Sequence, residues 1–140
     1  MSEPLFGQAH VDRYRETDGE DGHEWQGTRT LLLTTTGRKS RQKRTVPLIY
    51  QRHGDAYVLV ASNGGGAAPG WFLNLEEDPA VDVQVKAAHF SARARTATAE
   101  ERPALWRLMN ATGVPYDDFQ AKTERVIAVV LLEPVRAEEA

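Results

Sequence analysis

A short basic segment is the most distinctive chemical feature of the sequence. Five of the seven residues from 38 to 44 are basic: Arg38, Lys39, Arg41, Lys43 and Arg44. Glycine at position 37 permits a tight turn with exposed N–H groups, and the basic side chains and the Ser40 hydroxyl add donors. Such a loop can hold a phosphate or a polycarboxylate. The pattern leaves a second interpretation open, a solvated basic turn between two strands.

A glycine-rich segment is the second candidate for ligand contact. Residues 62–70 contain four glycines and one proline, a composition that is costly inside a helix or strand and therefore predicts a loop. Loops of this kind in small domains often contact ligands, and a plain flexible connection is the alternative. Trp71 and Phe72 follow directly, and they could wall a pocket or belong to the core.

Tyr116 is the third candidate, because it follows a helix break at Val114-Pro115. Its hydroxyl could reach a pocket, or its ring could simply pack. Other chemistries lack support. The chain has no cysteine, which excludes disulfides and thiol catalysis, and its four histidines stand singly, so we expect no metal site. The motifs G-x-S-x-G and G-x-G-x-x-G are absent, so neither a hydrolase elbow nor Rossmann NAD binding is indicated.

Hydrophobic periodicity predicts the elements that position these residues. We predict strands at residues 29–36, 44–52, 56–61, 81–86, 90–95 and 126–132, and helices at residues 8–17, 71–76, 98–112 and 116–122. The turn signal His53-Gly54-Asp55 joins residues 44–52 and 56–61 in a hairpin. Most strands are linked by short turns. This favours an α+β fold, mainly β, with a mostly antiparallel sheet closing into a small barrel and helices packed outside.

Length and composition limit the function classes. A chain of 140 residues, 41% apolar and 26% charged, suits one soluble domain. The net charge of −3 argues against a general nucleic-acid binder. The longest apolar run, Val126–Leu132, is far shorter than the roughly 20 residues of a membrane span, and residues 1–25 lack the apolar core of a secretory signal. We therefore expect a cytoplasmic protein, with a peripheral association with the membrane left open.

Taken together, four segments resemble the deazaflavin-dependent nitroreductase family of actinobacteria, whose members use reduced coenzyme F-420. These segments are Thr30–Ser40, Arg44–Tyr50, Val60–Gly65 and Trp71–Leu75. The resemblance implies a split β-barrel related to FMN-binding oxidases, formed by residues 22–136. Residues 1–21 would be an N-terminal segment, helical or loose, and residues 137–140 a tail.

The resemblance also implies the site residues. The anionic phosphate and oligoglutamate tail of F-420 would lie on Arg38, Lys39, Ser40 and Arg44, and the deazaflavin on Thr45, Val46, Pro47, Leu48 and Ile49. The rings or the phosphate would contact Val60, Ala61, Ser62 and Asn63, together with Gly70, Trp71, Phe72, Leu73 and Asn74. Tyr116 would face the substrate as the candidate catalytic residue.

The function implied is that of an F-420-dependent reductase, which passes a hydride to a quinone, a nitroaromatic or another activated unsaturated acceptor. No protein nucleophile is required. Two alternatives stay open. The first is an FMN-binding split-barrel protein. The second is a protein without catalytic activity, either a carrier of a cofactor or lipid or a module that docks acidic partners through residues 38–44. The expected partner is a small-molecule acceptor, with no nucleic acid and no transmembrane segment, and the expected assembly is a monomer or a homodimer.

Overall fold

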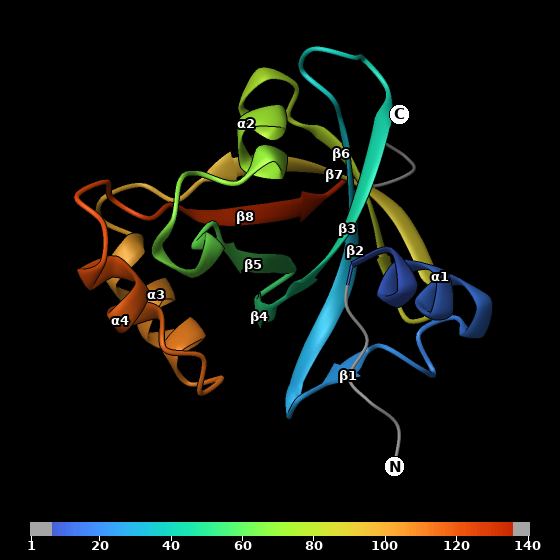
Figure 1. Cartoon of the computed structure of the whole chain (residues 1–140), viewed down its shortest axis with the longest axis horizontal. Coiled ribbons are helices and arrows are strands. Elements are labelled where there is room, and N and C mark those ends of the chain that lie inside the picture. Colours follow the sequence, from blue (N-terminus) through green and yellow to red (C-terminus); the bar gives the residue numbers. More distant parts are fainter. Residues whose placement is uncertain (1–6, 136–140) are drawn as a thin grey trace.

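Within residues 7–135, which the computed structural model describes, eight strands form one antiparallel sheet that curls on itself (Figure 1). The strands are β1 (Glu24–Trp25), β2 (Thr28–Thr36), β3 (Lys43–Ile49), β4 (Gln51–His53), β5 (Ala56–Val60), β6 (Ala80–Val85), β7 (Ala88–Thr96) and β8 (Val129–Pro134). Their order is β1-β2-β6-β7-β8-β5-β4, and β3 also pairs with β2. The mostly antiparallel sheet predicted from the sequence is confirmed.

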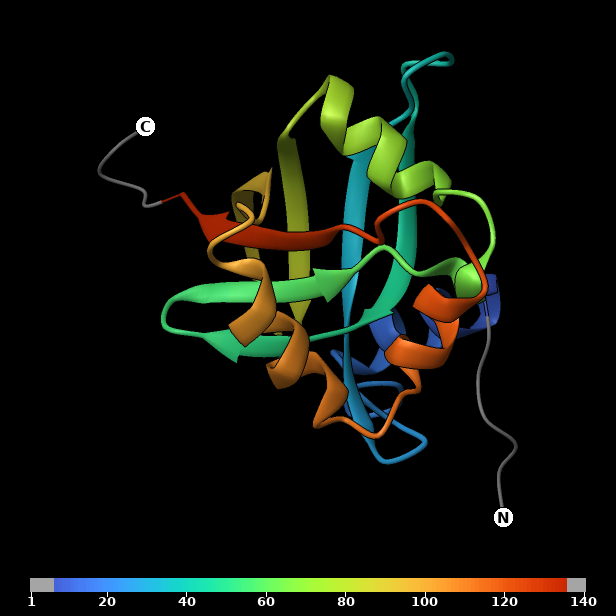
Figure 2. The same ribbon diagram turned by 90° about the vertical axis from the view of Figure 1, so that its left-hand side faces the viewer.

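The sheet curls because the chain passes directly from one of its edges to the other at Tyr50. β3 pairs with β2 as far as Ile49, and Tyr50 still donates its amide to the Arg29 carbonyl oxygen (3.1 Å). From Gln51 onward the chain pairs with β5 instead. Figure 2 shows β8, β5 and β4 running across β2, β3 and β6. The result is the small barrel that the sequence predicts.

The partner switch at Tyr50 corrects one predicted element. A single strand over residues 44–52, paired with residues 56–61, is wrong: only Gln51–His53 forms that hairpin. The physical reason is that the backbone of β3 is already paired with β2 along its whole length. Periodicity within a segment cannot reveal which neighbour will accept its hydrogen bonds.

The apolar strand β8 is buried on both faces, as its continuous apolar run predicts. Val130 and Leu132 point into the barrel core, whereas Val129 and Leu131 pack in a second cluster with residues of α3 and α4. The predicted start of this strand at residue 126 is wrong. Val126 is 72% exposed, and the Ile127 backbone bonds side chains of Gln120 and Arg102 rather than a neighbouring strand.

Helices cover the outside of the barrel (Figures 1 and 2). They are α1 (Gly7–Thr17), α2 (Gly70–Glu77), α3 (Arg102–Asn110) and α4 (Tyr116–Ala121), with a 3-10 turn, η1 (Asn63–Gly65). The four α-helices fall where the sequence predicts helices. Among the described residues no helix is long and apolar enough to cross a membrane.

The helix α1 is tied to the barrel by Tyr14. This side chain is fully buried and packs with Val11 against Leu32 of β2. Its hydroxyl donates to the Thr30 carbonyl oxygen (3.1 Å) and accepts from the Lys86 amide (2.8 Å). Burial raises the pKa of Tyr14 to about 12. Residues 1–6 of the predicted N-terminal segment, and the predicted tail, lie outside the described residues.

Glu101 connects the start of α3 to β7 and makes stability depend on pH. It exchanges hydrogen bonds with Thr98 in the reciprocal pattern of a capping box, and it accepts two from the Arg95 guanidinium (2.7 and 2.9 Å). These bonds lower the pKa of Glu101 from 4.5 to about 2. A lowered pKa in the folded state adds stability above pH 4.5, and that stability is lost as the pH falls toward 2.

Replacing Glu101 by glutamine is therefore expected to lower Tm at pH 7, because the neutral amide loses the ion pair with Arg95. The difference in Tm from the unmodified protein should shrink as the pH falls from 4.5 to about 2. Thermal unfolding across this range measures it, with Glu100→Gln as the neighbouring control. A difference that stays constant down to pH 2 would contradict the assignment.

Candidate functional site

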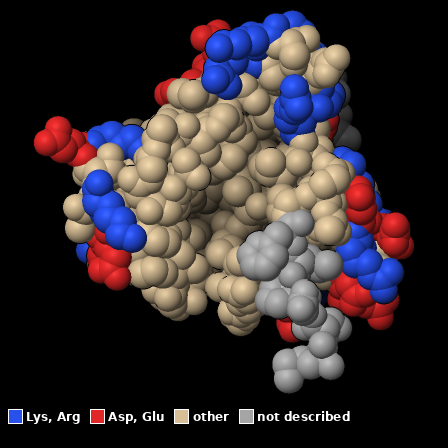
Figure 3. Space-filling model, viewed as in Figure 1, with Lys and Arg blue, Asp and Glu red and all other residues tan. Residues whose placement is uncertain are grey.

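Two hollows adjoin each other between β3 and α2. The cationic hollow, about 420 Å³, is lined by Thr35, Gly37, Arg38, Lys39, Ser40, Arg44, Val46, Gly70, Trp71 and Asn74. The aromatic cavity, about 510 Å³, is lined by Gly7, His10, Trp25, Thr30, Val46, Pro47, Leu48, Ile49, Val60, Ser62, Asn63, Pro69, Trp71, Val114, Tyr116 and Phe119. Val46 and Trp71 line both. Figure 3 shows the hollowed face, with Lys and Arg side chains gathered above it over the β2–β3 turn.

Asn74 on α2 holds the β2–β3 turn in place. Its side-chain oxygen accepts hydrogen bonds from the Arg38 amide (3.1 Å) and the Arg38 guanidinium (2.9 Å). Its side-chain nitrogen donates to Thr35 Oγ1 (3.2 Å). Asn74 is buried, so little water competes for these bonds. The helix after the glycine-rich loop therefore positions the basic turn.

Two of the five basic residues in the turn are engaged elsewhere. Arg41 forms an ion pair with Asp78 (3.9 Å), and Lys43 donates to Thr36 Oγ1 (3.0 Å). Neither residue lines the cationic hollow. Sequence reasoning could not separate these two from the other three, because their partners lie directly after α2 and on β2 rather than in the basic segment.

The remaining three basic residues, Arg38, Lys39 and Arg44, line the cationic hollow. Within the described chain, Lys39 and Arg44 form no ion pair and no side-chain hydrogen bond. Unpaired cations around one hollow raise the local concentration of anions and supply charge-assisted donors. The structure therefore favours an anion site over a merely solvated basic turn.

The aromatic cavity is bordered by the edge of β3, since the four consecutive residues Val46–Ile49 all line it. Successive residues of a strand point to opposite faces, so four in a row around one cavity means that the strand presents its edge. β3 pairs only with β2 among the described strands, and Pro47, which has no N–H, is tolerated at such an edge. The free backbone groups can bond the polar rim of a flat heterocycle.

Tyr116 brings a hydroxyl to the aromatic cavity. The side chain is 4% exposed, and its ring lies against Phe119 and Trp106. Within the described chain the Tyr116 hydroxyl has no hydrogen-bond partner. Every fully buried polar side-chain atom of the described residues does have a partner, so this hydroxyl is not fully buried. It therefore keeps some accessible surface, and the side chain lines the aromatic cavity. Burial raises the pKa of Tyr116 to about 12, which keeps the group a neutral donor near neutral pH.

Several lining residues were not predicted from the sequence. They are Gly7, His10, Trp25, Thr30, Val114 and Phe119 in the aromatic cavity, and Thr35 in the cationic hollow. His10 and Trp25 stack their rings at 6.2 Å on the side formed by α1 and β1. No local motif marks these positions, because they come from α1, β1, β2 and the α4 region, which meet only when the chain folds.

Four of the predicted site residues line neither hollow: Thr45, Ala61, Phe72 and Leu73. Ala61 is fully buried and donates its amide to the Ala128 carbonyl oxygen. Phe72 packs against the barrel core. Any contact of these four with a cofactor stays a prediction.

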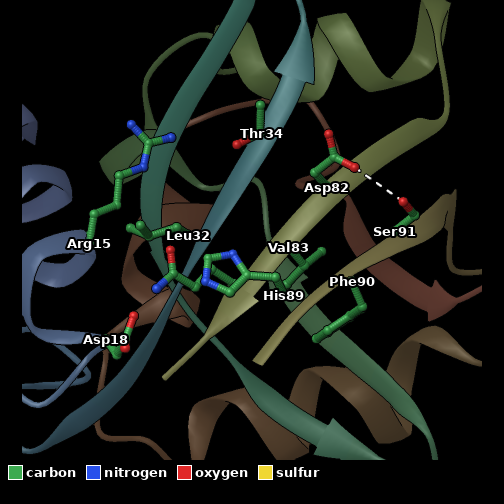
Figure 4. Close-up of a pocket in the computed structure, with 10 residues that line it drawn as sticks. Arg15, Asp18, Leu32, Thr34, Asp82, Val83, His89, Phe90 and Ser91 are labelled. Carbon is green, nitrogen blue, oxygen red and sulfur yellow. Dashed lines mark hydrogen bonds between the residues drawn. The ribbon is translucent and has the colours of Figure 1, made fainter. Parts of the chain in front are cut away.

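A third hollow, about 630 Å³, lies on the outer face of the sheet beside α1 (Figure 4). It is lined by Arg15, Asp18, Leu32, Thr34, Asp82, Val83, Gln84, His89, Phe90 and Ser91. Thr45 points to this side, where its hydroxyl bonds Arg15 (2.9 Å) and Thr34 (2.7 Å). No predicted site residue lines this hollow, and its lining has two aspartates and only one arginine, so it does not suit an anionic cofactor.

Comparison with known proteins assigns a family to this arrangement. The model of the F420H(2)-dependent quinone reductase family matches residues 6–134, nearly the whole chain. This chain belongs to that family. The quinone reductase family is one of deazaflavin-dependent oxidoreductases, so the enzyme class and the F-420 cofactor expected from the sequence are confirmed.

Relatives of known name cover most of the chain. The F420H(2)-dependent quinone reductase Rv1261c of Mycobacterium tuberculosis is 40% identical over 128 residues, 88% of this chain and 86% of the relative. A solved F420-H2 dependent reductase, FDR-A, is 39% identical with a TM-score of 0.68, covering 74% of this chain and 93% of that one. A solved domain-swapped dimer is 36% identical with a TM-score of 0.72, covering 88% and 93%. The split β-barrel fold of this quinone reductase family member is confirmed.

Proposed function

We propose that this protein binds reduced F-420 across the two joined hollows and uses it to reduce a quinone. The proposal rests on one observation: the cationic hollow and the aromatic cavity meet at Val46 and Trp71, which line both. F-420 combines a flat deazaflavin with a chain of phosphate and glutamate groups, and the joined hollows match both parts. Lys39 and Arg44 would hold the anionic chain, and the edge of β3 would hold the ring.

When bound, reduced F-420 supplies a hydride from its C5 atom, and the quinone becomes a hydroquinone by taking that hydride and one proton. The protein contributes binding, orientation and exclusion of water. Trp25, Trp71 and Phe119 wall the cavity in which the ring and the acceptor lie together. The Tyr116 hydroxyl donates a hydrogen bond to a quinone oxygen, where negative charge develops as the hydride arrives.

The lining of the aromatic cavity favours a neutral, planar acceptor. Its described lining contains four aromatic residues and one histidine, and it contains no Lys, Arg, Asp or Glu. Flat aromatic surfaces stack well on quinone rings, whereas a charged acceptor would lose its hydration without a compensating partner. We therefore place quinones ahead of charged acceptors, with nitroaromatics as a second neutral class to be assayed.

Trp71 is expected to report cofactor binding, because it lines both hollows. Titration with F-420 should give saturable quenching of tryptophan fluorescence at micromolar cofactor, after correction for absorption by the cofactor. Trp71→Phe should remove a large share of that quenching. Trp106→Phe is the matched control, since the Trp106 indole donates to Asp117 (2.6 Å) and lines neither hollow.

Each alternative function has its own outcome in these assays. No saturable quenching of the unmodified protein by F-420 would refute the proposal. A tighter response to FMN than to F-420 would favour a flavin-binding protein. Binding of reduced F-420 without its oxidation by menadione would favour a carrier.

A further inference from the structure

Arg125 holds the glycine-rich loop through hydrogen bonds on the side away from the two hollows. Its guanidinium donates to the carbonyl oxygens of Ala61 (3.2 Å), Ser62 (3.1 Å) and Gly66 (2.9 Å). Arg125 is held in turn by Gln120 of α4, whose side-chain nitrogen donates to the Arg125 carbonyl oxygen (2.7 Å). One side chain therefore ties residues more than fifty positions apart in the sequence, and it lines neither hollow.

The bonds from Arg125 to Ala61 and Ser62 determine the direction of two peptide units. In a planar trans peptide the C=O and N–H groups point in opposite directions. Because the carbonyls of Ala61 and Ser62 are turned toward Arg125, the N–H groups of Ser62 and Asn63 must point away from it. Ser62 and Asn63 line the aromatic cavity, and Arg125 does not. The two amides therefore face the cavity side of the loop.

These amides are free to bind a ligand. Within the described chain, the N–H groups of Ser62 and Asn63 donate to no acceptor. Ser62 is right-handed (φ −82°, ψ −41°) and Asn63 is left-handed (φ +45°). Successive residues of this kind turn their N–H groups into one concave surface that suits an electron-rich oxygen.

Packing on the other side keeps the loop from moving away from this position. A Cβ atom on Gly65 would lie 2.7 Å from the Phe119 carbonyl oxygen, so the loop lies directly against α4. Arg125 and α4 together confine it. Without the guanidinium, the Ala61 carbonyl would lose its partner and the Ser62 carbonyl would keep only the Gly65 amide (2.9 Å), so the Ala61–Ser62 peptide unit in particular could rotate.

We propose that Arg125 is a positioning residue for cofactor binding: it holds the Ser62 and Asn63 amides toward the aromatic cavity, where they donate to an oxygen atom of the deazaflavin ring. The inference rests on the proposed binding of F-420. It adds a residue outside the cavity whose removal weakens binding through the loop rather than through a direct contact.

The test compares the unmodified protein with Arg125→Ala and Arg125→Lys. Oxidised F-420 is titrated and followed by tryptophan fluorescence. The loss of well-directed hydrogen bonds should raise Kd about tenfold in Arg125→Ala, with a smaller rise in Arg125→Lys, which keeps the charge but not the planar fork. Millimolar guanidinium should restore part of the affinity of Arg125→Ala, and potassium at equal ionic strength should not. Arg107→Ala is the control, because it removes an arginine of α3 that lines neither hollow.

Amide NMR signals give a readout that does not depend on activity. In the unmodified protein, F-420 should shift the signals of Ser62 and Asn63, and in Arg125→Ala these shifts should be smaller. A Kd of Arg125→Ala within twofold of the unmodified value would overturn the inference. Failure of both variants to fold would assign Arg125 to general stability and overturn it as well. Failure of the unmodified protein to bind F-420 would instead refute the proposed function.

Discussion

Replacing Lys39 and Arg44 together by alanine is expected to weaken F-420 binding by about 2–6 kcal/mol, which is the sum of two charge-assisted hydrogen bonds of about 1–3 kcal/mol each. Both side chains line the cationic hollow, and neither has a partner within the described chain. Folding leaves them unpaired, so their full donor capacity is available to an anion. Fluorescence titration of the double variant measures the loss.

Lys43→Ala is the matched control for this prediction, because Lys43 lies in the same basic segment but bonds Thr36 and does not line the hollow. It should bind F-420 nearly as the unmodified protein does. Affinity of the unmodified protein should fall as salt rises, since exposed charges are screened within about 10 Å at 0.1 M. A double variant that binds normally, or binding that salt does not change, would place the anionic chain elsewhere.

Replacing Tyr116 by phenylalanine is expected to lower kcat for quinone reduction by about 10²-fold, the effect of removing one donor to a developing oxyanion. Cofactor binding should change little, because the ring and its packing on Phe119 and Trp106 are kept. Since burial raises the pKa of Tyr116 to about 12, the hydroxyl stays protonated from pH 6 to about pH 10. The kcat profile of the unmodified protein should show no inflection from this group in that range.

Stability provides the control for the Tyr116 prediction. The Tyr116 hydroxyl has no hydrogen-bond partner within the described chain, so its removal should leave Tm nearly unchanged. Tyr14→Phe should lower Tm instead, because the Tyr14 hydroxyl bonds Thr30 and Lys86 in a buried position. Normal turnover by Tyr116→Phe would show that the acceptor oxygen is bound by other donors.

Much of the fold could be predicted because its strands carry strong local patterns. The alternation of Val81, Val83 and Val85 predicted β6, and the continuous run in β8 predicted burial on both faces. The break at Tyr50 could not be predicted, because residues on both of its sides are equally suited to a strand. The two-residue strand β1 was also missed, since it is too short to show a period.

The residues of the candidate site could likewise be predicted only in part. The basic segment, the glycine-rich loop and Tyr116 were found from composition and from the resemblance to a family, and most of the predicted residues line one of the two joined hollows. His10, Trp25 and Arg125 were not found. Each of them contacts a partner on a distant element, and no spacing in the sequence encodes that contact.

The sequence by itself determined the class of this protein: a cysteine-free, mainly antiparallel barrel with a concentration of positive charge suited to an anionic cofactor. These properties follow from residue type and local periodicity. Only the tertiary structure decided which cations are unpaired, that β3 presents its edge to a cavity, and that Arg125 directs the loop amides. These properties depend on hydrogen-bond and packing partners far apart in the chain, which are chosen when the sheet curls and the helices pack on it.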